Sequence, residues 1–149
     1  MPPLIEIHRF EGGLPACVDR PEDTRLLPPE EWHEDGDHGL LLPVDAEPEA
    51  RFVNAPLIAI DFPVFHDGRG LSLAVLLRSR IGFAGELRAV GDVHPDLIHY
   101  LRRCGFDSFL LPPHRSLAAE DARLAPHSDY YQASIAEARP AFRRRRRGL

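Results

Sequence analysis

The sequence predicts an α/β fold, a small and mostly parallel sheet of about four strands with helices packed on it. Two observations lead to this prediction. Residues 57–111 alternate apolar runs typical of strands with helical patterns, in the order strand, helix, strand, helix, strand, and such units form parallel strands joined by right-handed crossovers. The chain also has 149 residues, of which 44% are hydrophobic and 28% charged, as expected of one globular domain.

The first 38 residues are expected to form an irregular, acidic and loop-rich N-terminal part. Their one strand pattern is the apolar alternation at 4–8. Residues 20–38 are dense in acidic and turn-forming residues, which favours loops. Residues 1–56 hold 13 acidic residues and four arginines, whereas 57–149 hold ten acidic residues and 14 arginines, so the negative charge is concentrated in the N-terminal part.

Apolar runs predict the elements that lead into the core. The run at 40–44, with proline near its end, predicts a strand, and a short helix is expected over 47–52. Residues 57–62 are almost continuously apolar and are followed by Pro63. This pattern is typical of a strand that is buried on both faces.

Helical spacing and glycine positions define the rest of the core. Leucines and an isoleucine at three- and four-residue intervals predict a helix over 71–81, which Gly82 ends. The remaining expected elements are a strand over 86–90, a helix opened by His94-Pro95-Asp96 and ended by Gly105, a strand over 106–111 and a last helix over about 117–138.

A single domain is therefore expected over 1–142, with its core at 57–111 and a disordered arginine tail at 143–149. Arg143 to Arg147 are five consecutive like charges, which repel one another and favour a solvated segment. No aromatic residues interleave this run, so we do not expect nucleic acid to be the partner. The alternative, nucleic-acid binding by the tail, predicts a salt-sensitive affinity that is lost when the tail is removed.

Several classes of protein are excluded by simple counts. No apolar run reaches the roughly 18 residues of a membrane-spanning helix, and the N-terminus lacks the pattern of a signal peptide. The two cysteines, Cys17 and Cys104, are too few for a disulfide framework or a thiolate metal site. We therefore expect a cytoplasmic protein without membrane contact and without a bound metal.

Polar residues follow two neighbouring strands of the predicted sheet. Ligands of open α/β sheets bind beyond the carboxyl ends of the strands, so the loops at 61–70 and 91–94 are expected to meet at one rim. The candidate catalytic residues there are Asp61, His66, Asp67 and Asp92, and the candidate anion- or partner-binding residues are Gly68, Arg69, Gly70 and His94.

These residue types suit the binding of an oxyanion. Gly68 and Gly70 flank Arg69 directly before a helix, where free backbone N–H groups and the helix dipole favour negative charge. The arginine adds a planar fork that matches an oxyanion, and His66 beside Asp67 is suited to proton transfer near neutral pH.

A purely structural interpretation remains open for the same loop. Asp67 is also a good helix cap, the glycines also shape turns, and Arg69 is placed to fasten the two loops by pairing with Asp92 or Asp61. The glycine spacing matches neither a phosphate-binding loop nor a dinucleotide fingerprint, so no nucleotide cofactor is expected. A metal site in the acidic loop at 33–38 is the weaker alternative.

Three blocks of the sequence resemble a known bacterial family. They lie at 60–70 (IDFPVFHDGRG), 85–93 (GELRAVGDV) and 100–107 (YLRRCGFD), and in this order they are similar to the proteobacterial family known as domain of unknown function 934. Members of that family are often described as oxidoreductases of sulfite reduction, because they are typically encoded next to the assimilatory sulfite reductase hemoprotein. The resemblance carries no catalytic residues with it.

The resemblance implies an accessory protein of sulfur assimilation. It points to the sulfite reductase hemoprotein as the partner, through docking, assembly or support of electron delivery. This chain has no cysteine cluster, so the siroheme and the iron–sulfur cluster are expected only in the partner reductase. Enzyme activity is left open: one alternative is an oxidoreductase component without its own redox cofactor, and another is a small anion-binding enzyme or sensor that uses the loop at 66–70.

Overall fold

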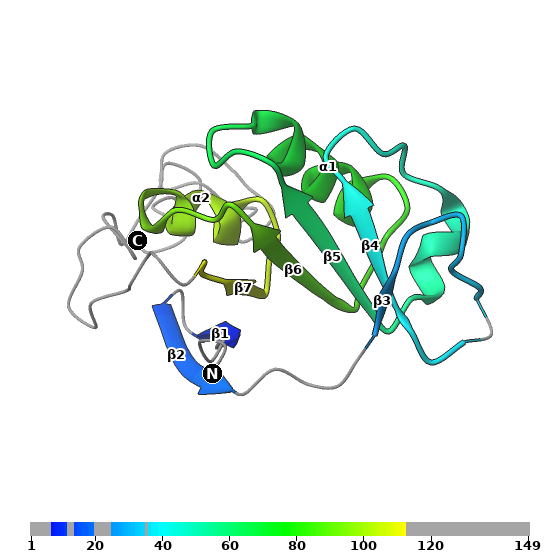
Figure 1. The fold of residues 1–149 in the computed structure, drawn as a ribbon, viewed down its shortest axis with the longest axis horizontal. Coiled ribbons are helices and arrows are strands. Elements are labelled where there is room, and N and C mark those ends of the chain that lie inside the picture. The colour runs from blue at the N-terminus through cyan, green and yellow to red at the C-terminus, as the bar shows by residue number, and fades with distance from the viewer. Residues whose placement is uncertain (1–6, 12–13, 20–24, 35, 113–149) are drawn as a thin grey trace, which may run out of the picture.

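The structure is a computed structural model that describes residues 7–11, 14–19, 25–34 and 36–112 (Figure 1). Its strands are β1 (Ile7–Glu11), β2 (Leu14–Asp19), β3 (Leu26–Leu27), β4 (Gly39–Pro43), β5 (Leu57–Phe62), β6 (Glu86–Gly91) and β7 (Ser108–Leu110). Its helices are α1 (Gly68–Ser79) and α2 (Ile98–Arg103), with short 3-10 helices η1 (Ala50–Asn54) and η2 (Pro95–Leu97).

All described strands join one seven-stranded sheet in the order β2-β1-β7-β6-β5-β4-β3. Each neighbouring pair from β3 to β7 is parallel, while β1 runs antiparallel to both β2 and β7. The mixed α/β, mostly parallel fold is thus confirmed. The sheet has more strands than the four predicted, and the number in the prediction was wrong.

The additional strands come from the N-terminal part. The strand expected over 4–8 lies instead over Ile7–Glu11, which pairs with β2 as a hairpin and with β7 on its other side. Cys17, which falls in the part expected to be loop-rich, lies in β2 opposite Arg9. Strand β3 pairs with the start of β4. Because β3 has only two residues, no apolar periodicity in the sequence could indicate it.

The core elements lie close to their predicted positions. Strand β5 has the expected bounds, and helix α1 begins three residues before its predicted start because Asp67 caps it there. The helix expected over 47–52 is the 3-10 helix η1, and the helix after His94 divides into η2 and α2. The expected helix at 117–138 and the arginine tail lie outside the described residues.

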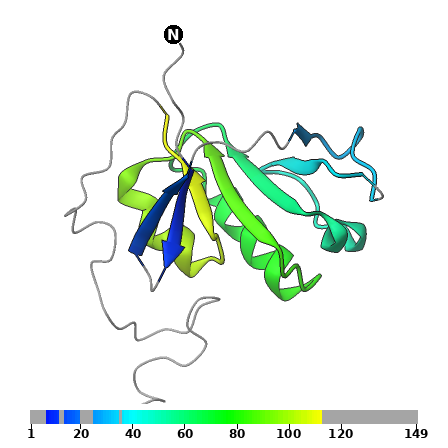
Figure 2. The same ribbon diagram turned by 90° about the horizontal axis from the view of Figure 1, so that it is seen from below.

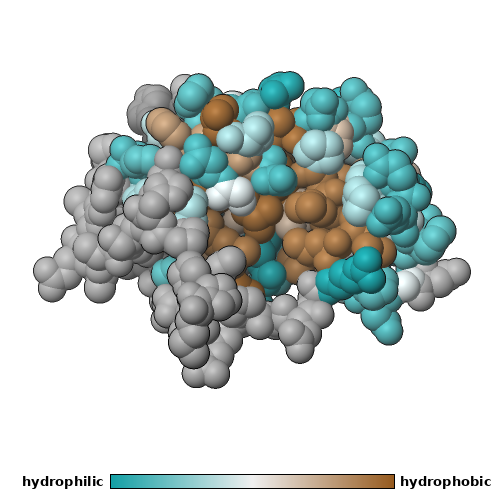
Figure 3. Space-filling model, viewed as in Figure 1, coloured by the Kyte–Doolittle hydropathy of each residue, from teal (hydrophilic) through white to brown (hydrophobic). Residues whose placement is uncertain are grey.

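The order of the parallel strands places the described helices on one side of the sheet. From β3 to β7 the strands follow one another in sequence order, so right-handed crossovers put every connection on the same face. Side chains of that face, such as Ile58, Ile60 and Phe109, form one core with Leu73 of α1 and Leu101 of α2. Figure 2 shows α1 lying along one side of the strands. In the view of Figure 3, apolar side chains gather over β4 to β6 with hydrophilic residues around them.

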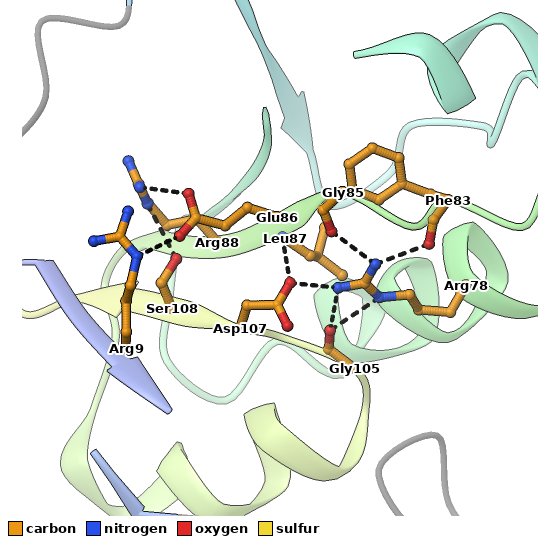
Figure 4. A network of polar contacts seen from close by, with 10 residues as sticks. All are labelled: Arg9, Arg78, Phe83, Gly85, Glu86, Leu87, Arg88, Gly105, Asp107 and Ser108. Atoms are coloured by element: carbon orange, nitrogen blue, oxygen red, sulfur yellow. Dashed lines mark hydrogen bonds and ion pairs between the residues drawn. The ribbon is translucent and has the colours of Figure 1, made fainter. Parts of the chain in front are cut away.

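Arg78, near the end of α1, fastens the edge of the sheet where the parallel strands begin (Figure 4). Its guanidinium donates hydrogen bonds to the carbonyl oxygens of Gly105, Phe83 and Gly85 at 2.8–3.0 Å. It also pairs with Asp107 at 2.6 Å, and that carboxylate accepts the backbone N–H of Leu87 at 3.0 Å. One side chain therefore joins α1 to the segments that enter β6 and β7.

A second polar cluster lies on the opposite face of the sheet. Glu86 accepts hydrogen bonds from both Arg9 and Arg88, at 2.9 and 2.8 Å, and Arg88 also donates to the Ser108 hydroxyl at 3.1 Å. These residues come from β1, β6 and β7, which are neighbours in the sheet (Figure 4). A buried arginine is tolerated here because it is paired and hydrogen-bonded.

Candidate functional site

The candidate residues gather where the central parallel strands end. Because β4, β5 and β6 are parallel neighbours, the segments that follow them leave the sheet at one edge. The backbone N–H of Asp92, after β6, donates to the carbonyl oxygen of Phe62 at the end of β5 at 2.8 Å. The expected meeting of the two loops at one rim is thus present in the structure.

Arg69 is bound to Asp67 within its own loop. Its Nε donates to Oδ1 of Asp67 at 3.0 Å, and its Nη2 donates to Oδ2 at 2.7 Å, so the fork meets both carboxylate oxygens. Oδ1 also accepts the backbone N–H of Arg69 at 3.1 Å, which makes Asp67 the N-cap of α1. The Arg69 side chain is 63% exposed, whereas that of Asp67 is 11% exposed.

This pair shifts the titration of both groups. The hydrogen bond from the Arg69 side chain lowers the pKa of Asp67 below its usual value, and the backbone N–H and charge of Arg69 act in the same direction. The same hydrogen bond and the charge of Asp67 raise the pKa of Arg69, with a smaller contribution from Asp45. At neutral pH the loop therefore holds a charged pair.

Asp92 fastens the two loops together. Its Oδ2 accepts the backbone N–H of Phe65 at 2.8 Å, across 27 positions of sequence. The structural interpretation expected Arg69 to join the two loops by pairing with Asp92 or Asp61, and this expectation was wrong. The Asp92 carboxylate joins the loops by accepting the N–H of Phe65, whereas Arg69 pairs with Asp67. A carboxylate that holds a main-chain N–H in this way positions the loop.

Gly91 allows β6 to come close to the end of β5. Its φ of +84° lies in the left-handed region that favours glycine. A Cβ at this position would collide with the Asp61 carboxylate and with the backbone of Phe62. Asp61 itself is exposed at the end of β5, where it pairs with Val90 in the register. Asp61 therefore lies beside the junction of the two loops.

The rings of the two candidate histidines both lie close to the ring of Phe65. The ring centroid of Phe65 is 5.1 Å from that of His66 and 4.8 Å from that of His94. His94 Nδ1 accepts the backbone N–H of Asp96 at 3.0 Å, so His94 caps η2. The phenylalanine ring thus contacts both the exposed His66 and a histidine with a capping role.

The two glycines of the loop have different surroundings. A Cβ at Gly70 would collide with the ring of Phe62, so close packing of α1 on β5 explains this glycine. A Cβ at Gly68 would meet nothing within 4 Å. Gly68 therefore borders open space at the start of α1.

That open space is a cavity of about 840 Å³ between the segment after β4 and the start of α1. Val44, Leu73 and Leu76 contribute apolar surface to it, and four of the expected site residues line it, namely His66, Asp67, Gly68 and Arg69. Asp61, Asp92 and His94 do not line it, so the structure divides the predicted set between this cavity and the loop junction around Phe65.

The sequence interpretation missed two acidic residues of the cavity. Asp45 and Glu47 line it from the segment that follows β4. The signal was available, because the rule that selected the loops after β5 and β6 applies equally to the predicted strand at 40–44. Within the described part of the chain, no three His, Cys, Asp or Glu side chains are grouped so as to hold a metal ion.

The arrangement has a clear chemical consequence. Arg69 already binds a carboxylate with both arms of its fork, so an external oxyanion must compete with Asp67 for it.

Away from this site, burial raises the pKa of the Cys104 thiol, which suits a packing role. Neither described helix has the length and apolar character required to cross a membrane.

Comparison with known families gives one match. The family described as "Bacterial protein of unknown function (DUF934)" matches residues 39–142, a span that begins at the first residue of β4. It includes the cavity and the loop junction and covers more than half of the 149 residues. No curated protein and no solved structure is similar enough to the chain to count as a match.

Proposed function

Because the chain belongs to the DUF934 family of bacterial proteins, we propose that it is an accessory protein of assimilatory sulfite reduction that acts with the sulfite reductase hemoprotein. The resemblance of its three sequence blocks to family members encoded beside that hemoprotein supports the pathway. In this proposal the protein works in the cytoplasm by docking, with cofactor assembly or support of electron delivery as its consequence. Siroheme and the iron–sulfur cluster belong to the partner.

One observation favours docking over catalysis, namely that Arg69 and Asp67 bind each other. Both oxygens of the Asp67 carboxylate hold the Arg69 guanidinium, at 3.0 and 2.7 Å. Asp92 similarly holds the main chain of Phe65. Carboxylates engaged in this way shape a surface rather than transfer protons. Val64, which lines the cavity and is 41% exposed, gives this surface an apolar contact point.

Co-purification tests the proposal directly. A tagged full-length chain is expected to retain the hemoprotein from cells grown on sulfate, with the visible spectrum of siroheme in the eluate. Deletion of the gene is expected to lower sulfite reductase activity in the same cells. Unchanged activity after deletion, with no hemoprotein retained by the tag, contradicts the proposal.

Two exposed valines provide a matched pair of variants. Val64→Asp is expected to reduce the retained hemoprotein at least about tenfold, because a charge at the centre of an apolar contact is strongly unfavourable. Val53→Asp changes a valine with the same 41% exposure in η1, away from the rim, and is expected to have no effect. Equal retention by both variants would remove the rim from the docking surface.

The cavity favours a second candidate function, a small anion-binding enzyme or sensor. Its lining includes Arg69, 63% exposed, next to the open position at Gly68. Calorimetric titration with sulfite, sulfate and phosphate tests this function. Asp67→Asn is expected to strengthen anion binding by removing the competing carboxylate, and Arg69→Ala to abolish it. Equal binding by Arg69→Ala would exclude this site.

A further inference from the structure

We propose that the cavity is a docking groove for this chain's own C-terminal stretch, in which Phe142 occupies the apolar floor and Arg143 to Arg147 pair with the acidic rim. The term rim groove is used here for the surface formed by Val44, Asp45, Glu47, Val64, Leu73 and Leu76. This proposal goes beyond the function proposed above; because both use Val64, a bound tail would compete with the hemoprotein for this surface.

The floor of the rim groove suits an aromatic anchor. Val44 and Leu73 are 6% and 3% exposed, and Leu76 and Val64 add apolar surface beside them. With about 840 Å³, the space is larger than one side chain needs. An aromatic ring buries a large apolar area at low conformational cost, which makes a phenylalanine an effective anchor in such a groove.

The rim carries negative charge that is available to a partner. Asp45 and Glu47 are exposed, and neither forms an ion pair with another residue of the described ranges. The remaining carboxylate, Asp67, is neutralised by Arg69. The rim groove therefore has two exposed acidic groups without an ion pair to a described residue next to an apolar floor, and this combination fits an apolar residue followed by cationic ones.

The C-terminal stretch has that composition and is placed to reach the groove. Phe142 is followed directly by five arginines, and no other part of the sequence has more than two consecutive basic residues. The chain leaves β7 at the same edge of the sheet as the rim groove, because β4 to β7 are parallel. Three strand spacings, about 14 Å, separate β7 from β4. The 30 residues from Pro112 to Phe142 are enough to cover this separation, because even a helical rise of about 1.5 Å per residue would exceed it.

Amide chemical shifts of the full chain test the proposal. Two full-length variants remove the anchor or the charge: Phe142→Ser, and a variant with all five arginines at 143–147 changed to glutamine. Each is expected to shift the backbone amides of Val44, Asp45, Glu47 and Gly68 relative to the wild-type chain. Unchanged amides at these four positions in both variants would overturn the proposal, as would shifts confined to other parts of the sheet.

The contribution of the acidic rim is tested by a double variant that removes its charge, with a second double variant as the control. Asp45→Asn with Glu47→Gln is expected to lower the ratio of bound to free tail about two- to tenfold, because two exposed ion pairs are lost. Glu30→Gln with Glu31→Gln removes the same charge from exposed positions outside the groove and is expected to leave the ratio unchanged. If the two double variants lowered the ratio of bound to free tail equally, the contact would be a nonspecific charge attraction to the whole protein, and the proposal would be overturned.

Dilution separates the tail of the same molecule from that of a second copy. Contact within one molecule predicts groove amide shifts that stay constant over a 50-fold dilution, and shifts that move toward those of Phe142→Ser as salt is raised. Shifts that disappear on dilution would assign the groove to a neighbouring molecule and would contradict contact within one chain.

Discussion

Asp67 is the residue whose protonation the candidate site controls most directly. Its pKa lies below the usual value of about 3.9 because the Arg69 side chain donates to it. A carboxylate whose pKa is lower in the folded than in the unfolded chain stabilises the fold when the pH is above the pKa of the unfolded chain. This stabilisation is lost as the pH falls through the pKa of the folded chain.

We therefore predict that Arg69→Ala raises the pKa of Asp67 toward its usual value, as measured by NMR titration of the carboxyl carbon. The stability difference between the wild-type chain and Arg69→Ala should be largest near neutral pH and should shrink below about pH 4. In an Asp67→Asn background, Arg69→Ala should show no such pH dependence. A difference that persists in that background would assign the effect to another carboxylate.

Two glycines of the rim predict opposite effects of the same substitution. Gly91→Ala is expected to destabilise the protein by about 2–4 kcal/mol, because the added methyl group meets the Phe62 backbone at a φ of +84°. Gly68→Ala is expected to stabilise it by about 0.4–1 kcal/mol, since the helix start has open space there. Urea unfolding measures both, and a Gly68→Ala variant that is less stable than the wild-type chain would contradict the prediction.

Among the elements, helix α1 depends on Arg78 for its position on the sheet. Arg78→Met keeps an unbranched apolar stem but leaves the carbonyl oxygens of Phe83, Gly85 and Gly105 without this donor. We predict a loss of about 2–4 kcal/mol in the free energy of unfolding. Arg78→Lys should lose less, because one ammonium still reaches part of this set. Equal losses in the two variants would point to side-chain packing rather than to the hydrogen bonds.

Elements of the core were predictable because their burial leaves a clear pattern. Residues 57–62 are apolar at nearly every position, and β5 is buried on both faces with only Asp61 exposed. The hairpin β1-β2 gave no comparable signal, because its position depends on pairing with β7, about 100 residues later in the chain. Strand β3, with two residues, is defined only by its hydrogen bonds to β4.

The candidate site was predictable as a location and less so as a set of contacts. The loops after β5 and β6 meet as expected from the rule for parallel strands. The choice of Asp67 as the partner of Arg69 was not predictable, because three acidic residues lay within reach and only the helix start selects one of them. Asp45 and Glu47 were missed because the same rule was not applied to the strand at 40–44.

For the whole molecule, the single tryptophan reports on the unity of the core. Trp32 is 1% exposed and belongs to the same apolar cluster as Leu77 of α1 and Phe109 of β7. We predict that Trp32 fluorescence and far-ultraviolet ellipticity change at the same urea concentration, as expected for one cooperative unit. Two separate midpoints would mean that the region around Trp32 unfolds independently of the central strands.

The short length of β3 also affects whether two molecules can associate by pairing strands at this edge of the sheet. An unpaired strand edge is a template on which further chains add and aggregate. At this border of the sheet the template is interrupted: β3 contributes two residues, and β4 ends in Pro43, which has no N–H to offer. Within the described residues, this border of the sheet therefore offers little continuous edge to which a strand of another copy could pair.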